Sequence, residues 1–210
     1  MIYGKFCIEH HHSIFEYEIR SRVRYNKMHR LFHPSVEVKN IVYAGTIGTR
    51  VDPEDLSKKS DVITFNKGFP SGCHIKFDRN PITLYTSGKF IMPGMKSYEE
   101  ACERYEVLKG ILNPFLDVHD YSELKIANLV AQSHLGYEVR MPRLWVELTS
   151  MDYEVMYEPE SFPGMIVKID DATTNLFSSG SFMILGCTSI EHAERVEKDF
   201  KDVCNSTPLS

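Results

Sequence analysis

The side chains of this sequence that could bind a partner occur twice, in the same order. Three pairs share side-chain class and context, one of amides and two of aromatic rings: Asn40 and Asn128, Phe69 and Phe162, Tyr85 and Phe177. The members lie 88, 93 and 92 residues apart, so only loop lengths differ. Amides and aromatic rings bind by hydrogen bonding and stacking, and the sequence has no G-x-S-x-G, H-E-x-x-H or G-x-x-x-x-G-K-[ST] motif. The sequence therefore indicates a binding protein and not an enzyme.

A repeat of about 90 residues is too long for one unit of a solenoid and is typical of two fused half-domains related by a pseudo-two-fold axis. We divide the chain into an N-terminal extension (1–37), a first repeat (38–120) and a second repeat (121–206). Two similar halves present two similar surfaces to one partner. Duplex DNA is a partner with a matching dyad.

Each repeat carries the same predicted elements. A strand (about 39–47 and 125–135) leads to a short helix, which begins near Pro53 in the first repeat and covers about 143–149 in the second. Four strands follow, over 61–66, 73–79, 82–87 and 89–95, and over 153–158, 165–170, 174–178 and 181–187. A longer helix, capped by Ser97 or Ser189, closes each repeat. The order β-α-β-β-β-β-α, twice, predicts an α+β fold with helices on one face of an antiparallel sheet, which leaves the other face to solvent or a partner.

Composition and charge narrow the class of protein. The 210 residues are 42% apolar, and no apolar run approaches the ~18 residues of a membrane span. Five cysteines without C-x-x-C spacing predict a soluble protein of a reducing compartment. The net charge of −5 argues against a non-specific nucleic-acid binder, whose affinity comes mostly from phosphate neutralisation. Residues 121–210 alone carry −7, from 7 basic and 14 acidic side chains.

The N-terminal extension alternates apolar and charged side chains over residues 14–25, which predicts a strand. Its basic members, Arg20, Arg22 and Arg24, could contact DNA phosphates; the alternative is a disordered tail or a strand docked only on protein. Upstream, His10-His11-His12 lies near Cys7 and could ligate a metal. Neighbouring residues of an extended chain point in opposite directions, so we expect a solvated polar patch, no metal and no cofactor.

Short motifs in both repeats resemble one known family. They are Asn40-Ile41-Val42, Tyr85-Thr86-Ser87-Gly88-Lys89, Gly94-Met95-Lys96-Ser97, Tyr157-Glu158-Pro159-Glu160-Ser161-Phe162-Pro163-Gly164 and Phe177-Ser178-Ser179-Gly180. Together they resemble the TATA-box-binding protein family over about residues 38–204. The resemblance implies a saddle: a curved ten-stranded antiparallel sheet with a concave underside for DNA and four helices on its convex face.

The resemblance also implies binding of duplex promoter DNA in the minor groove, with sharp bending. Four aromatic side chains would open two base steps, Phe69 with Tyr85 at one end of the site and Phe162 with Phe177 at the other. The alternative is that these are core aromatics on strands. The proline that follows Phe69 and Phe162 argues against this alternative, because each lies between strands.

Further DNA contacts are carried over from the family. Asn40 and Asn128 match its central asparagines, whose amides can donate to thymine O2 and adenine N3. Lys76 and Lys168 fall where the family has a phosphate-contacting arginine, each nine residues before the second aromatic of its repeat. The alternative for either is a solvated surface lysine. The remaining predicted DNA contacts are Val42, Ser87, Lys89, Val130 and Ser179.

Two positions depart from the family pattern. Pro93 and Leu185 stand where the family has a small hydroxyl residue, usually threonine. Proline cannot donate to the sheet ladder, so Pro93 predicts a bulge. The hairpins after Lys76 and Lys168 are also shorter than in the family and lack a second phosphate-contacting arginine. These departures predict weaker or altered TATA preference with the DNA-bending architecture intact.

The resemblance further implies protein partners. Residues 158–162 match a family loop that contacts transcription factor IIB, which makes Glu158, Glu160 and Ser161 candidate contacts. Other preinitiation factors and RNA polymerase are further expected partners, and a membrane is not. The expected location is the nucleus of a eukaryote, or otherwise an archaeal cytoplasm or a virus-infected cell. The alternative function is an adaptor of the same fold that binds transcription factors with weak or no TATA-specific DNA binding.

Overall fold

The computed structural model describes residues 35–117 and 120–207. Contacts divide the chain into two units, Met1–Ser35 and Val36–Ser210, and every element below belongs to the second. The strand predicted over residues 14–25, its arginine row and the three histidines lie outside the described residues. Among those that are described, no helix is both long enough and apolar enough to cross a membrane.

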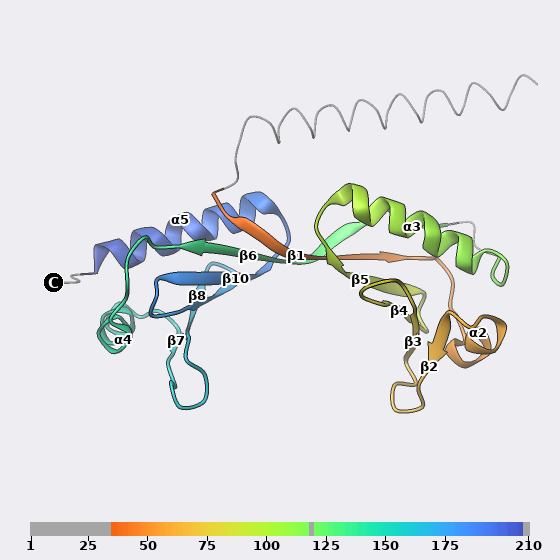
Figure 1. Cartoon of the computed structure of the whole chain (residues 1–210), viewed down its shortest axis with the longest axis horizontal. Helices are drawn as coiled ribbons and strands as arrows, with labels where there is room; N and C mark the ends of the chain where they lie inside the picture. The colour runs from red at the N-terminus through yellow and green to blue at the C-terminus, as the bar shows by residue number, and fades with distance from the viewer. Residues whose placement is uncertain (1–34, 118–119, 208–210) are drawn as a thin grey trace, which may run out of the picture. The chain divides into compact units, whose positions relative to one another are not determined.

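Ten strands form one antiparallel sheet, in the order β2-β3-β4-β5-β1-β6-β10-β9-β8-β7. The first five are β1 (Glu37–Thr46), β2 (Ile63–Phe65), β3 (Gly72–Ile75), β4 (Ile82–Tyr85) and β5 (Lys89–Met95). The second five are β6 (Lys125–His134), β7 (Val155–Met156), β8 (Met165–Ile169), β9 (Ala172–Leu176) and β10 (Ser181–Cys187). The two edges of this order mirror each other, with β1 against β6 at the centre, and the sheet is curved (Figure 1).

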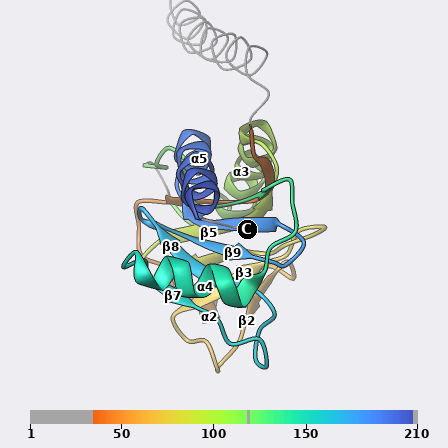
Figure 2. The same ribbon diagram turned by 90° about the vertical axis from the view of Figure 1, so that its left-hand side faces the viewer.

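Four helices accompany the sheet: α2 (Pro53–Lys59), α3 (Tyr98–Leu112), α4 (Met141–Ser150) and α5 (Ile190–Ser206). The long helices α3 and α5 cover the same face, one over each half, and α2 and α4 lie beside the outer strands β2 and β7 (Figures 1 and 2). The predicted caps begin the long helices: Ser97 Oγ accepts from the backbone N–H of Glu100, and Ser189 Oγ from that of His192. The predicted α+β saddle is confirmed.

The core lies between the sheet and the two long helices. Phe90 of β5 and Phe182 of β10 occupy matching places and are fully buried. Phe90 packs against Tyr105 of α3 at 5.2 Å between ring centroids, and Phe182 packs against Phe200 of α5 at 4.9 Å. Because side chains alternate along a strand, burial of one face leaves every second residue on the other. We call the sheet face that α3 and α5 leave uncovered the open face.

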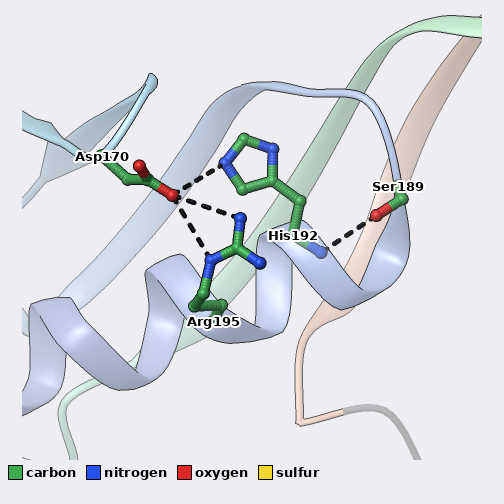
Figure 3. A network of polar contacts seen from close by, with 4 residues as sticks. All are labelled: Asp170, Ser189, His192 and Arg195. Carbon is green, nitrogen blue, oxygen red and sulfur yellow. Dashed lines mark hydrogen bonds and ion pairs between the residues drawn. The ribbon is translucent and has the colours of Figure 1, made fainter.

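A polar cluster fixes the β8–β9 turn to α5 (Figure 3). Asp170 lies in that turn at φ 52, a conformation that aspartate tolerates. Its carboxylate accepts hydrogen bonds from Arg195 Nε at 3.4 Å and Nη2 at 3.2 Å. The Nε2 atom of His192 lies 3.5 Å from the same oxygen, which is too long for a strong hydrogen bond. The cluster thus joins the β8–β9 turn to α5 at the protein surface.

Some predicted strands are shorter in the structure. The strand predicted over 73–79 ends at Ile75, and a turn that contains Pro81, which has no N–H to donate, follows. The strand predicted over 153–158 is only Val155–Met156, because the backbone N–H groups of Ser161 and Phe162 bond Glu158 O in a turn. The helix predicted over 143–149 extends to Met141–Ser150.

Candidate nucleic-acid interface

Two asparagines and two valines lie at the centre of the open face, where β1 pairs with β6. Asn40 stands opposite Val130, and Val42 opposite Asn128. Ile41 and Leu129, which alternate with them and face each other in the register, are buried under the helices. The four predicted contacts thus form one symmetric group of half-buried side chains, which we call the central quartet.

Each asparagine of the central quartet accepts one backbone hydrogen bond. Asn40 Oδ1 accepts from Gly94 N at 3.0 Å, and Asn128 Oδ1 accepts from Gly186 N at 3.1 Å. An amide oxygen held this way fixes the orientation of the amide group. Its NH₂ group carries the donors, and donors match the acceptors that every base pair shows in the minor groove.

The two glycines belong to β-bulges. The β1–β5 register shifts opposite Pro93 and Gly94, and the β6–β10 register shifts opposite Leu185 and Gly186. Both glycines have positive φ, 83 for Gly94 and 91 for Gly186. The bulge predicted from Pro93 is therefore present. The second half has the same bulge without proline, so glycine in the left-handed region is the shared cause.

An aromatic pair lies on each outer part of the sheet. Phe69 in the β2–β3 loop meets Tyr85 of β4 with ring centroids 6.0 Å apart and planes at 71°. Phe162 in the β7–β8 loop meets Phe177 after β9 at 5.9 Å and 69°. All four rings are half-buried. Two separate stretches of each repeat thus build the same edge-to-face pair.

Each loop aromatic depends on a nearby glycine. A Cβ atom at Gly72 would lie 2.8 Å from the ring of Phe69, and one at Gly164 would lie 2.6 Å from the ring of Phe162. Both loops project to the side of the sheet opposite α3 and α5 (Figure 1). The repeated glycine therefore makes room for the ring beside the open face.

The predicted phosphate contacts are exposed at matching places. Lys76 donates its backbone N–H to Val62 O at 2.8 Å, and Lys168 donates its own to Glu154 O at 3.0 Å. The Lys168 ammonium also donates to Thr173 Oγ1 at 2.9 Å. Lys89 begins β5 and is exposed. Its N–H lies 3.4 Å from Ser87 Oγ. 

Ser87 has a counterpart in Ser179, whose Oγ lies 3.3 Å from the backbone nitrogen of Ser181. Both serines are exposed in tight turns. Glu158, Glu160 and Ser161 are exposed too, in the turn that carries Phe162. Within the described ranges, no group of three or more His, Cys, Asp or Glu side chains could hold a metal ion.

Sequence reasoning missed six residues of the open face. They extend the face across the inner strands: His74, Thr83 and Ile91 in the first half, Ile166, Asn175 and Met183 in the second. The sequence held a signal for two of them. Thr83 stands two positions before Tyr85, and Asn175 two positions before Phe177, and residues two positions apart on a strand face the same side of the sheet.

Comparisons with known proteins agree with this geometry. A family model described as "Transcription factor TFIID (or TATA-binding protein, TBP)" matches residues 123–205. The "TATA-box-binding protein" of Methanocaldococcus jannaschii is 29% identical over 178 residues, covering 82% of this chain and 95% of the relative. "TATA-box-binding protein 2" of Haloferax volcanii is 30% identical over 165 residues, covering 76% and 88%.

A solved structure shares the fold. The chain matches "Methanococcus jannaschii TBP" with a TM-score of 0.71 and 28% identity, over 83% of this chain and 100% of that one. The similarity therefore extends over both halves of the sheet, beyond the residues that the family model matches. From sequence and structure together, this chain belongs to the TATA-box-binding protein family of transcription factors.

Proposed function

We propose that this protein is a transcription initiation factor that binds promoter DNA in the minor groove, bends it, and nucleates assembly of the preinitiation complex. The two matched aromatic pairs, at 6.0 and 5.9 Å, carry the proposal. A large apolar ring can replace base stacking at an opened step. Two such pairs on opposite outer parts of one open face suit two opened steps in one bent site.

The central quartet supports a minor-groove partner. The amides of Asn40 and Asn128 are held by backbone donors and present their own donors between two valines. In the minor groove, each base pair offers acceptors, and only guanine adds a donor. A surface of donors and apolar side chains therefore fits this groove.

Phosphate contacts are few in this proposal. Lys76, Lys89 and Lys168 are exposed, and the net charge of the chain is −5. Three phosphate contacts give a slope of about −3 for the logarithm of affinity against the logarithm of salt concentration. Shape and apolar contact then supply the larger share of affinity.

A second candidate function is the adaptor of the same fold. The exposed side of α4 carries Trp145 and Val146, which are 40% and 57% exposed. In α2, the corresponding helix, Glu54 pairs with Lys58 and Asp55 with Lys59. The apolar side chains exposed on α4, where α2 has ion pairs, favour a protein partner that binds the second half, because exposed apolar patches mark interaction sites.

Membership of the family supports our proposals for the partner and the location. We expect a factor IIB-like protein to contact Glu158, Glu160 and Ser161, with other preinitiation factors and RNA polymerase as further partners. The relatives compared above are archaeal. We therefore propose the cytoplasm of an archaeal cell; the comparisons give no support to a nucleus or a virus-infected cell.

Energy transfer between dyes at the two ends of short duplexes tests the proposal. The protein should shorten the end-to-end distance of an AT-rich duplex. Replacing A·T by inosine·cytosine pairs should preserve this effect, because that exchange alters the major groove and keeps the minor-groove pattern. An adaptor without DNA binding would leave every duplex unbent. Loss of binding on the inosine exchange would indicate the major groove instead.

A further inference from the structure

His74 is a polar residue of the open face, beside the aromatic pair of the first half. It lies on β3 between Cys73 and Ile75, which are fully buried, so its own side chain is on the opposite face of the sheet. Its ring is half-buried and lies nearly parallel to the ring of Phe69, with centroids 5.7 Å apart and planes at 11°. An imidazole therefore stands next to a ring that we propose to enter a base step.

The two ring nitrogens of His74 have different surroundings. Nδ1 lies 3.2 Å from Oγ1 of Thr83, which pairs with His74 in register across β3 and β4. Nε2 is at the far end of the ring from the backbone. It has no hydrogen-bond partner among the residues that the structure describes, and it is not buried. One nitrogen thus orients the ring, and the other is accessible to a ligand on the open face.

A hydrogen-bond donor at Nε2 matches the minor groove of DNA. Every base pair shows acceptors there, and only guanine adds a donor. The imidazolium form of histidine has donors at both nitrogens, so Nδ1 can donate to Thr83 Oγ1 while Nε2 donates to DNA. The negative potential of a narrow minor groove also attracts arginine, lysine and histidine. The charged form of His74 therefore suits the protein and the groove at the same time.

The side chains that pair with His74 or stack on it carry no carboxylate: they are Thr64 of β2, Thr83 of β4 and Phe69. By register, the nearest titratable residues on its face are Lys76, two positions along the chain, and Tyr85, two positions along β4. The helix α2 also contacts β3, and its charges form two ion pairs of their own, Glu54–Lys58 and Asp55–Lys59. No anion in this set balances an imidazolium, and DNA can supply one.

The second half has no such group at the matching place. Ile166 pairs with Asn175 as His74 pairs with Thr83, and each stands two positions before the predicted phosphate-contacting lysine of its half. Isoleucine neither donates a hydrogen bond nor carries a charge. The two halves therefore offer different chemistry to DNA at equivalent places. The fold accepts isoleucine in the second half, which makes His74→Ile a matched substitution.

We propose that His74 contacts DNA as the imidazolium and donates a hydrogen bond from Nε2 to a base acceptor in the minor groove, next to the step that Phe69 and Tyr85 open. This rests on the proposed function and adds to it a specificity-determining contact in one half of the site. Thr83 is the positioning residue, because its Oγ1 holds the other nitrogen. Since histidine loses its charge as pH rises between 5 and 8, DNA should bind more weakly at the higher pH.

A pH profile separates this contact from a structural role. The affinity of the full chain for an AT-rich duplex is measured by fluorescence anisotropy at pH 6 and pH 8, at one ionic strength. The parent should bind about threefold to tenfold more tightly at pH 6, because a hydrogen bond from a charged donor is stronger than one from a neutral donor.

Variants assign the pH dependence to His74. His74→Ile should bring the ratio of the two affinities near one and weaken binding at pH 6. His74→Gln keeps a donor without the charge and should also give a ratio near one. His192→Gln removes an imidazole from α5, away from the open face, and should keep the parent ratio. Circular dichroism at both pH values checks the fold, and His74→Gln carries the comparison if His74→Ile does not fold.

The outcomes distinguish this contact from the proposed function. A parent ratio near one, with binding and bending intact at both pH values, overturns the role of His74 and leaves the proposed function standing. A parent ratio that His74→Ile and His74→Gln preserve has the same meaning. Failure of the parent to bind any duplex at either pH overturns the proposed function, and the role of His74 with it.

Discussion

The Oδ1 atom of Asn128 accepts a hydrogen bond from the backbone N–H of Gly186 at 3.1 Å, which joins β6 to the bulge of β10. Asn40 and Gly94 repeat this contact at 3.0 Å between β1 and β5. One contact thus serves two purposes. It satisfies a backbone donor in each bulge. Because the amide oxygen faces the bulge, it also directs the NH₂ groups of the two central amides away from the bulge.

Replacing Asn128 by aspartate separates these two purposes. In Asn128→Asp, a carboxylate oxygen can still accept from Gly186, so the melting temperature should change little. The NH₂ donors are lost and a negative charge faces DNA. Affinity for an AT-rich duplex should fall tenfold or more, since a good contact between an amide and a base contributes about 1–3 kcal/mol. Fluorescence anisotropy measures the affinity.

The control for this change is Asn205→Asp on α5, whose Oδ1 accepts from Tyr137 Oη at 3.0 Å. It adds the same charge away from the open face and should leave affinity within about twofold of the parent. Parent-like DNA binding by Asn128→Asp would show that the central amide donates nothing to DNA.

Alanine at the two bulge glycines should destabilise the protein unequally. Both Gly94→Ala and Gly186→Ala place a side chain at positive φ, which costs about 1–2 kcal/mol. At Gly94 the new Cβ would also lie 1.9 Å from Asn80 Nδ2, whereas at Gly186 the nearest atom is 3.7 Å away. Urea unfolding should therefore show a larger loss for Gly94→Ala.

Gly110→Ala is the control for backbone effects. Gly110 lies within α3, and a Cβ there would meet nothing within 4 Å. Alanine is the better helix former, so this variant should gain about 0.5–1 kcal/mol. Equal losses at Gly94 and Gly186 would mean that Asn80 moves aside at no cost.

Charge reversal in the β7–β8 loop should weaken a protein contact. Glu158→Lys with Glu160→Lys should reduce recruitment of a factor IIB-like protein to the DNA complex by more than about 1 kcal/mol, within the range of close interfacial charge pairs. Binary DNA binding should not change. The exposed residues Glu103 and Glu138, reversed together, provide the same change of net charge elsewhere. Loss of DNA binding with recruitment intact would contradict the assignment of this loop.

Two buried thiols should make the fold sensitive to alkali. Burial raises the pKa of Cys73 from 9.0 to about 11 and that of Cys204 from 9.0 to about 12. Above pH 9 the unfolded chain loses these protons while the folded chain keeps them, so the free energy of unfolding falls as pH rises. Each thiol contributes a slope of up to about 1.4 kcal/mol per pH unit until its folded pKa is reached.

Urea unfolding at several pH values between 8 and 11 measures this slope. The Cys73→Ala and Cys204→Ala double variant should be less stable at pH 8 and should lose stability more slowly above pH 9. The same slope in parent and variant would show that other groups dominate the alkaline loss.

Much of the fold could be predicted because the repeat constrains it. The caps Ser97 and Ser189 follow from local chemistry that does not depend on distant contacts. The bulge was predicted from Pro93, but the cause that both halves share is the glycine that follows. The resemblance to a family supplied the saddle. The short strand β7 could not be predicted, because the turn at Glu158 competes with the strand for the same backbone groups.

The site was predictable in part for a similar reason. Phe69 and Phe162 stand out because each precedes a proline between strands. That each ring meets its partner edge to face depends on the approach of a loop to a strand end, which sequence spacing does not give. The contact between His74 and Thr83 depends on their register across two strands, which became visible only in the folded sheet.

The most direct test of DNA bending removes the aromatic pair of the second half. Energy transfer between dyes at the ends of an AT-rich duplex is measured with the parent, with Phe162→Ala plus Phe177→Ala, and with Trp145→Ala on α4 as control. The double variant should stay folded by circular dichroism, because both rings are half-buried and lie outside the core between the sheet and the long helices. It should lose most of the bending that the parent and the control produce. Bending by the double variant equal to that of the parent would contradict the account.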